Sequence, residues 1–282
     1  MTATALRRFA DELPSEGSYS LWVGPLSGDA WFTHNDEAQH YAASTMKLAL
    51  VIAAYTEAES GRLDLDQPVA VRNDFRSASR SGRFGIDAAE DEDTEPWRHL
   101  GSKAALRWLC HRALVRSSNL ATNLVLEAVD TDAIAGVLDK VGARSSRVER
   151  GIEDAAAREA GLDNLVTARD LARTLRGLAT AHVAGRDACE EILSILRAQQ
   201  VNDAIPRGLP AGVSVAHKPG WVDGVCHDVA VVYPPDSLPF VFVMCTTSEL
   251  STSAARELIA DGASAAWSDR FDMEKRNLAL PS

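Results

Sequence analysis

The sequence has few of the features that mark membrane, metal-binding or nucleic-acid-binding proteins. Its four cysteines are scattered, without a C-x-x-C pair or a Cys/His cluster, so no metal site is expected. No apolar stretch approaches the length of a membrane span. Basic residues number 29 against 40 acidic ones, for a net charge of −11, which argues against a nucleic acid partner. Nothing in the sequence calls for a metal or an organic cofactor.

The first residues also lack an apolar core and a small-residue cleavage signal, the marks of a signal peptide. Leu6, Phe9, Ala10 and Leu13 instead recur at helical spacing and predict a short amphipathic helix. We expect a cytoplasmic protein from the sequence as written, or an exported one from which an N-terminal segment has been removed. The scattered cysteines suit a reducing compartment, and Cys226 is expected to be accessible.

What is present begins with Ser44 and Lys47, the only S-x-x-K pair in the chain. Residues 48–57 (LALVIAAYTE) are apolar and free of Gly and Pro, which predicts a buried helix that begins near Ser44. Side chains three residues apart share one face of a helix. A serine there lies at the positive end of the helix, and a buried neutral lysine can accept its proton. The competing interpretation is a capping serine and a solvated lysine.

Two further short motifs follow in order. Ser117-Ser118-Asn119 precedes an apolar helical run, and Lys218-Pro219-Gly220 ends the alternating, strand-like run 213–218. Taken alone, Ser117 and Asn119 are better explained as helix caps, and Lys218 as a solvated charge at a strand end. The ordered set S-x-x-K, S-x-N, K-x-G is what favours a catalytic interpretation.

This ordered set resembles the serine penicillin-recognising superfamily, and most closely the class A β-lactamase-like serine hydrolases. The similarity covers most of residues 19–268. It implies a two-lobed α+β fold, with an antiparallel sheet built from both chain ends, flanking helices and an all-helical lobe. We expect a single domain over residues 1–282, with the α/β lobe at about 1–43 and 205–282 and the helical lobe at about 44–204.

The resemblance also implies a role for each motif residue. Ser44 is the expected nucleophile, Lys47 its activator, and Ser117 the group that passes a proton to the leaving nitrogen. Asn119 and Lys218 are expected to bind substrate. The oxyanion site is expected at the backbone N–H groups of Ser44 and of Trp221, the residue that follows Gly220.

The sequence departs from the family pattern at three places. Pro219 replaces a hydroxyl residue that would bind a substrate carboxylate, and Ser118 replaces the aspartate of S-D-N. The glutamate that activates the deacylating water has two possible positions: counting from Arg150, which is expected to pair with Asp163, gives Ile152, whereas counting from Ser117 gives Glu153. Glu153 is therefore a candidate catalytic residue, and a solvated loop carboxylate is the alternative.

The periodicity of the rest of the chain fits this plan. Strands are predicted at 18–24, 30–34, 213–218, 228–233 and 240–246, and helices at 44–58, 102–115, 118–129, 131–140, 167–180, 187–199 and 252–271. Residues 73–97 form a long irregular insert, whose acidic part, 87–95, is expected to be a solvated loop.

The function expected from the sequence is a serine acyl hydrolase that opens a β-lactam, a small cyclic amide, through an acyl-enzyme on Ser44. The alternatives are a related intracellular peptidase, amidase or esterase, and a penicillin-binding protein that is acylated but not turned over.

Overall fold

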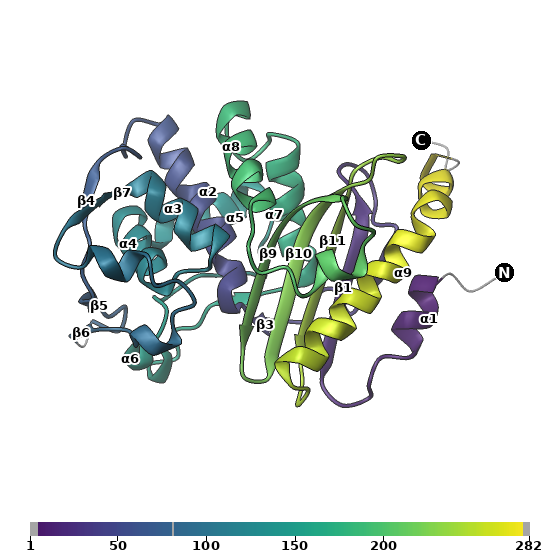
Figure 1. Ribbon diagram of the computed structural model, residues 1–282, viewed down its shortest axis with the longest axis horizontal. Helices are drawn as coiled ribbons and strands as arrows, with labels where there is room; N and C mark the ends of the chain where they lie inside the picture. Colours follow the sequence, from purple (N-terminus) through teal and green to yellow (C-terminus); the bar gives the residue numbers. More distant parts are fainter. Residues whose placement is uncertain (1–4, 81, 279–282) are drawn as a thin grey trace.

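The computed structural model describes residues 5–80 and 82–278, and its centre is a five-stranded antiparallel sheet (Figure 1). The spatial order is β2-β1-β11-β10-β9. The strands span, in chain order, β1 Ser18–Pro25, β2 Phe32–His34, β9 Ser214–Val222, β10 Val225–Tyr233 and β11 Phe240–Thr247. The predicted sheet from both chain ends is confirmed.

The pairing of β1 with β11 joins the two ends of the chain. The register runs from Ser18 opposite Thr247 to Pro25 opposite Phe240. Both strands are buried on both faces, which explains their nearly continuous apolar sequences. Strands β9, β10 and β11 follow one another as a meander.

Helices cover both faces of this sheet. On one face, α1 (Ala5–Asp11) and α9 (Thr252–Leu278) enclose a core that contains Leu6 and Ile259. On the other face lie α7 (Ala168–Ala179) and α8 (Arg186–Arg197), which contact β1, β9, β10 and β11. The amphipathic N-terminal helix is thus present, with Leu6 fully buried.

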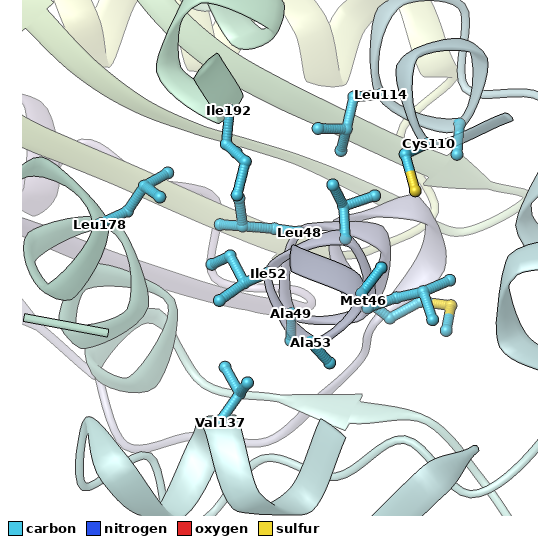
Figure 2. Close-up of a cluster of buried hydrophobic side chains, with 14 of the residues drawn as sticks. Met46, Leu48, Ala49, Ile52, Ala53, Cys110, Leu114, Val137, Leu178 and Ile192 are labelled. Atoms are coloured by element: carbon cyan, nitrogen blue, oxygen red, sulfur yellow. The ribbon is translucent and has the colours of Figure 1, made fainter. Parts of the chain in front are cut away.

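Helix α2 (Met46–Glu59) is the centre of the helical part, to the left of the sheet in Figure 1. It is apolar on every side, as expected for a helix surrounded by protein. It packs against α3 (Leu106–Val115), α4 (Asn119–Val129), α5 (Thr131–Lys140) and α8. Figure 2 shows Leu48 and Ile52 of α2 among Leu114, Val137, Leu178 and Ile192.

The core around α2 continues onto the sheet. One connected cluster of buried residues contains Leu48 and Leu124 from the helices together with Val229 and Val243 from the strands. The surface where the helical part meets the sheet is therefore packed, and it is along this surface that the motif residues lie.

The connecting segments carry short elements that periodicity did not predict. They are β3 His40–Tyr41 with β8 Leu165–Val166, β4 Pro68–Ala70 with β7 Lys103–Ala105, β5 Phe75–Arg76 with β6 Arg83–Phe84, the helix α6 Ala155–Glu159, and the 3-10 turns η1 Ala43–Thr45, η2 Ala88–Glu90, η3 Pro96–His99 and η4 Ile205–Gly208. Each is too short to leave a readable period in the sequence.

Candidate active site

Ser44 lies in the 3-10 turn η1, directly before α2 begins at Met46. The helix was expected to begin at Ser44 itself and starts two residues later. Ala43 has a φ of 44°, and Thr45 closes the turn by donating from its N–H and its hydroxyl to Ala42 O. The turn leaves Ser44 partly exposed between buried neighbours, which is a suitable position for a nucleophile.

Lys47 lies in the first turn of α2 and is completely buried. Its Nζ donates to Ser117 O at 2.7 Å, to Asn119 Oδ1 at 2.8 Å and to Ser117 Oγ at 3.2 Å. Burial lowers the pKa of Lys47 from 10.5 to about 7, and the nearby Asp91 and Glu153 carboxylates oppose this change. The solvated-lysine interpretation is therefore wrong for Lys47.

Lys218 reaches the same serine from the sheet. Its Nζ donates to Ser117 Oγ at 2.9 Å and to Pro219 O at 2.6 Å, and the side chain is fully buried. Burial lowers the pKa of Lys218 well below its ordinary value, and the neighbouring Lys47 lowers it further. Strand β9 does not end at Lys218 as expected but continues to Val222, so Lys218 lies inside the sheet.

Within the segment 117–119, one residue caps helix α4 and the other two contact the buried lysines. Ser118 is the N-cap of α4, because its Oγ accepts from Ala121 N at 3.1 Å. Ser117 has a left-handed backbone, with a φ of 58°, and its Oγ lies between the two lysines. Asn119 is the first residue of the helix and bonds Lys47. The capping interpretation thus applies to Ser118 and not to Ser117 or Asn119.

Gly220 is where β9 comes closest to the serine turn. A Cβ built on Gly220 would lie 2.8 Å from Ser44 N and 2.9 Å from Thr45 N, closer than atoms can pack. Trp221 follows directly, partly buried, with the Arg256 guanidinium 4.6 Å from its ring centroid. The absence of a side chain at 220 therefore lets the strand backbone lie against the backbone of Ser44.

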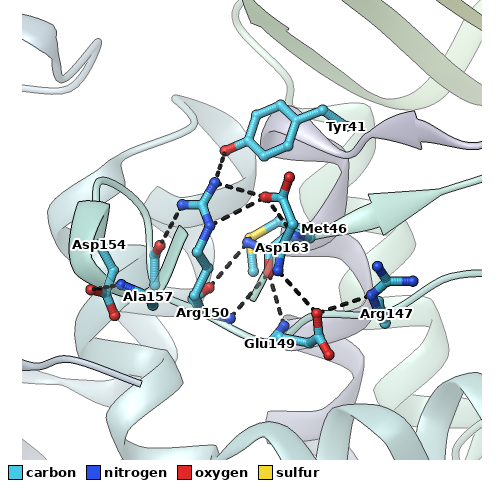
Figure 3. A network of polar contacts seen from close by, with 10 residues as sticks. Tyr41, Met46, Arg147, Glu149, Arg150, Asp154, Ala157 and Asp163 are labelled. Atoms are coloured by element: carbon cyan, nitrogen blue, oxygen red, sulfur yellow. Dashed lines mark hydrogen bonds and ion pairs between the residues drawn. The ribbon is translucent and has the colours of Figure 1, made fainter. Parts of the chain in front are cut away.

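The segment after α5 is anchored by the predicted ion pair (Figure 3). Arg150 is buried, and its Nη2 and Nε donate to Asp163 Oδ1 at 2.9 and 3.2 Å, while Nη2 also reaches Tyr41 Oη at 3.2 Å. Asn164 receives the backbone N–H groups of Glu149 and Arg150. The two ends of the loop are thereby held together, so residues 151–162 form a loop that leaves and returns at the same place.

Within this loop Ile152 and Glu153 lie differently. The Asn123 side chain accepts from Ile152 N at 2.8 Å and donates to Ile152 O at 3.0 Å, which fixes Ile152 on helix α4. Glu153 has a φ of 63°, and its Oε2 accepts from Asp87 N at 2.8 Å. Desolvation raises the pKa of Glu153, and its charge acts on Lys47. Glu153 is thus an exposed carboxylate within electrostatic range of the lysine.

Sequence reasoning missed Asp91. The acidic segment 87–95 was expected to be solvated, but Asp91 and Asp93 are buried. Asp93 pairs with Arg112, and Asp91 receives the N–H groups of Asn119 and Leu120 at the start of α4. The expectation failed because a helix N-terminus and a partly buried guanidinium both favour anions beside them. The clue was Ser118, which leaves that helix end without the aspartate of the family pattern.

The remaining expectations concern features away from this cluster. All four cysteines are free and buried, so the expected accessibility of Cys226 is wrong. Among residues 5–80 and 82–278 we find no group of three or more His, Cys, Asp or Glu arranged to hold a metal ion. No helix within the same ranges combines the length and apolar character needed to cross a membrane.

Comparison with known proteins gives a consistent result. A β-lactamase from Amycolatopsis lactamdurans is 28% identical over 252 residues, covering 88% of this chain and 78% of its own. Among solved structures, a β-lactamase from Sphaerobacter thermophilus has a TM-score of 0.77 at 24% identity, covering 99% of this chain and 97% of its own. The structure of PBP-A has a TM-score of 0.79 at 18% identity, covering 95% of this chain and 96% of its own.

The model of the family described as "Beta-lactamase enzyme family" matches residues 2–269, which is nearly the whole chain. The match includes all three motifs and both parts of the sheet. With its α+β fold and its serine–lysine cluster, the chain belongs to the β-lactamase enzyme family.

Proposed function

We propose that this protein is a serine acyl hydrolase of the class A β-lactamase type, which opens a β-lactam through an acyl-enzyme on Ser44. The observation that carries the proposal is the meeting of two buried lysines at one hydroxyl. Lys47 from α2 and Lys218 from β9 both donate to Ser117 Oγ. Burying two lysines costs folding free energy, and a structural role does not explain it.

The first step is acylation. Lys47 in its neutral form accepts the hydroxyl proton as Ser44 Oγ attacks the lactam carbonyl carbon, either directly or through an intervening group. A pKa of about 7 makes a large fraction of Lys47 neutral at neutral pH. The negative charge that develops on the carbonyl oxygen is stabilised, in this proposal, by the N–H groups of Ser44 and Trp221. The missing side chain of Gly220 lets the strand that carries Trp221 lie against Ser44 N.

The second step breaks the ring C–N bond. The leaving nitrogen needs a proton, and Ser117 is the proposed donor, since its Oγ contacts the lysines on both sides. The proton that Lys47 received from Ser44 can replace the one that Ser117 gives away, so the step balances without another acid. A substrate carboxylate would favour the protonated form of Lys218 and pair with it, and Asn119 orients the substrate while its Oδ1 accepts from Lys47 Nζ.

Water must then hydrolyse the ester on Ser44. Glu153 is the proposed base for this step. A second outcome is an enzyme that is acylated and then deacylated slowly. Two contacts favour it: the hydrogen bonds of the Asn123 side chain to Ile152, and the hydrogen bond from Asp87 N to Glu153. Pro219, which lacks the hydroxyl of the family pattern, favours a peptidase, amidase or esterase substrate as the third candidate.

The test is hydrolysis of a chromogenic cephalosporin by the purified protein and by Ser44→Ala, with Ser60→Ala, an exposed serine, as the matched control. Intact-protein mass spectrometry records the acyl-enzyme in the same samples. We expect Ser44→Ala to abolish both signals and Ser60→Ala to change neither. Turnover by Ser44→Ala, or no adduct and no turnover in the wild type, would refute the β-lactam proposal.

The pH dependence tests the role of Lys47. A neutral lysine is required, so the acylation rate should rise with pH through a midpoint of about 7 and level off above it. A rate that falls over this range would exclude Lys47 as the base.

Sustained turnover distinguishes a β-lactamase from a protein that reacts once and stops at one equivalent. Glu153→Gln then shows whether Glu153 is needed to hydrolyse the ester on Ser44.

A further inference from the structure

The insert 73–97 ends against the catalytic cluster rather than in solvent. Asp91, which is 7% exposed, accepts five hydrogen bonds. The donors are Asn119 N at 3.0 Å, Leu120 N at 2.9 Å, Trp97 Nε1 at 2.9 Å, Ser118 Oγ at 3.2 Å and Asp93 N at 3.2 Å. Three of them belong to the first residues of α4, so one carboxylate is bonded to the beginning of the helix.

A carboxylate is suited to this place for a physical reason. The first turn of a helix has free N–H groups and the positive end of the helix dipole. The cap residue Ser118 satisfies Ala121 N but carries no charge. Asp91 supplies the missing negative charge from another part of the chain, 28 residues before Asn119.

The contacts continue from Asp91 to the site. Asp91 Oδ1 holds the backbone of Asn119, whose side-chain Oδ1 accepts from Lys47 Nζ at 2.8 Å. The preceding segment includes Ser117, which offers both its carbonyl and its hydroxyl to the same Nζ. All the acceptors described for Lys47 are therefore attached to the helix end that Asp91 holds.

We propose that Asp91 is a positioning residue of this site: its carboxylate fixes the start of α4, and through Asn119 and Ser117 it sets the place and protonation of Lys47. Asp91 does not touch the reacting atoms. The role of Lys47 in acylation rests on the proposed function. The effect of Asp91 on the position and the pKa of Lys47 does not depend on it.

Electrostatics support the geometry. The ionisable groups that act on Lys47 are Asp91 from the insert, Glu153 from the loop after α5, and Lys218 from β9. Asp228 acts in turn on Lys218. Asp91 is the larger of the two carboxylate effects that raise the pKa of Lys47 against desolvation. Without its charge, the amine should lose its proton at a lower pH.

The experiment measures Lys47 directly and needs no substrate. The chain has five lysines, Lys47, Lys103, Lys140, Lys218 and Lys275, so protein labelled with carbon-13 at lysine Cε gives few signals. Lys47→Met assigns the signal of Lys47, which is then titrated in the wild type and in Asp91→Asn. We expect the pKa of Lys47 to fall by about one unit in Asp91→Asn.

Asp93→Asn is the matched control. Asp93 belongs to the same insert, is also buried and also loses its charge, but its carboxylate bonds Arg112 and Glu95 N and not the start of α4. Its contact with Asp91 is made by its backbone N–H, which the substitution keeps. It should leave the Lys47 titration unchanged. An unchanged titration in Asp91→Asn, or an equal shift in Asp93→Asn, would overturn the proposal.

A second variant keeps the test decisive if Asp91→Asn does not fold. The exchange Asp91→Ser with Ser118→Asp returns a carboxylate to the start of α4 from within the helix segment. It should restore the wild-type pKa of Lys47 to within a few tenths of a unit, and a folded exchange variant with a displaced titration would contradict the proposal. Failure of the wild type to react with a cephalosporin would refute the proposed function and leave this titration valid.

Discussion

Lys47 illustrates what the site costs the protein at the level of a single residue. The lysine is fully buried, and burial lowers its pKa from 10.5 to about 7. A difference of this size corresponds to about 5 kcal/mol of folding free energy, as an upper bound. The unfolded chain binds the proton more tightly than the folded protein between these two values. Stability should therefore rise with pH from about 7 to 10.5, and the full cost applies below about 7.

We predict that Lys47→Met stabilises the protein while it removes acylation. Methionine fills the space without a charge, but Ser117 O and Asn119 Oδ1 lose a donor, so the net gain at pH 7 should be about 2 kcal/mol. The gain should shrink as the pH rises from 7 to about 10, because the folded protein no longer binds the proton there and the unfolded chain begins to lose it. Urea unfolding at both pH values measures it. Lys103→Met, at an exposed lysine, should change little at either pH. A Lys47→Met protein no more stable than wild type at pH 7 would contradict the argument.

How far the sequence predicts these residues depends on how local the signal is. The spacing of Ser44 and Lys47 and the runs beside Ser117 and Lys218 are local patterns, and the structure gathers Lys47, Ser117, Asn119 and Lys218 into one hydrogen-bonded cluster. Asp91 carries no local signal, because its partners at the start of α4 are separated from it by many residues. Counting residues also cannot decide whether Ile152 or Glu153 occupies the position of the family glutamate, because an irregular loop has no repeating backbone geometry.

At the level of elements, the site depends on the contact between strand β9 and the turn η1. Sequence alternation predicts the strand but ends it at Lys218, because Pro219 and Gly220 are unusual inside a strand. The structure continues it to Val222, with Gly220 paired to His227 of β10. The glycine that weakens the sequence signal is the residue that permits the close approach to Ser44 N.

We predict that Gly220→Ala damages the site more than the fold. The added Cβ would meet the backbone nitrogens of Ser44 and Thr45 at 2.8 and 2.9 Å, and neither can move as a flexible side chain does. Displacing one oxyanion donor should lower the acylation rate about 10²-fold, and the strain should cost about 1–3 kcal/mol of stability. Stopped-flow acylation and thermal unfolding measure the two effects.

Gly136→Ala is the control for the same change of residue. Gly136 lies in helix α5, and nothing lies within 4 Å of its added Cβ. Alanine there should raise stability by about 0.5–1 kcal/mol through helix propensity and leave acylation unchanged. If Gly220→Ala acylates as fast as Gly136→Ala, the strand does not set the position of the Ser44 backbone.

At the scale of the whole molecule, the two chain ends form one sheet and a helical region lies beside it. Local patterns predict most of these strands and helices, but the spatial order β2-β1-β11-β10-β9 comes from pairings such as Ser18 with Thr247, which no local pattern encodes. The placement of predicted strands at both chain ends, with helices between them, supplied the expectation of one sheet, and the resemblance to a family implied the two-lobed arrangement. The shared core explains why it is stable, because a single buried cluster contains residues of α2, α4, β10 and β11.

We propose from this core, which joins the helical region to the sheet, that the chain folds as one domain over residues 5–80 and 82–278. The prediction uses a residue of the second core, far from the site. Leu6 of α1 is fully buried against α9, on the face of the sheet opposite the helical region. Leu6→Ala should cost about 2–4 kcal/mol. In a cooperative molecule that loss lowers the urea midpoint of the helical region and of the sheet by the same amount.

Pulse-labelling hydrogen exchange with mass spectrometry follows both regions in one sample, through peptides from α4 and from β11. Coincident midpoints in the wild type, shifted together in Leu6→Ala, are the expected result. Arg8→Ala is a surface change in the same helix. It should change the free energy of unfolding of either region by no more than about 0.5 kcal/mol. Two lobes that unfold independently would instead leave the α4 midpoint in place while that of β11 falls. The active site would then join two separately stable units, because its lysines come one from each region.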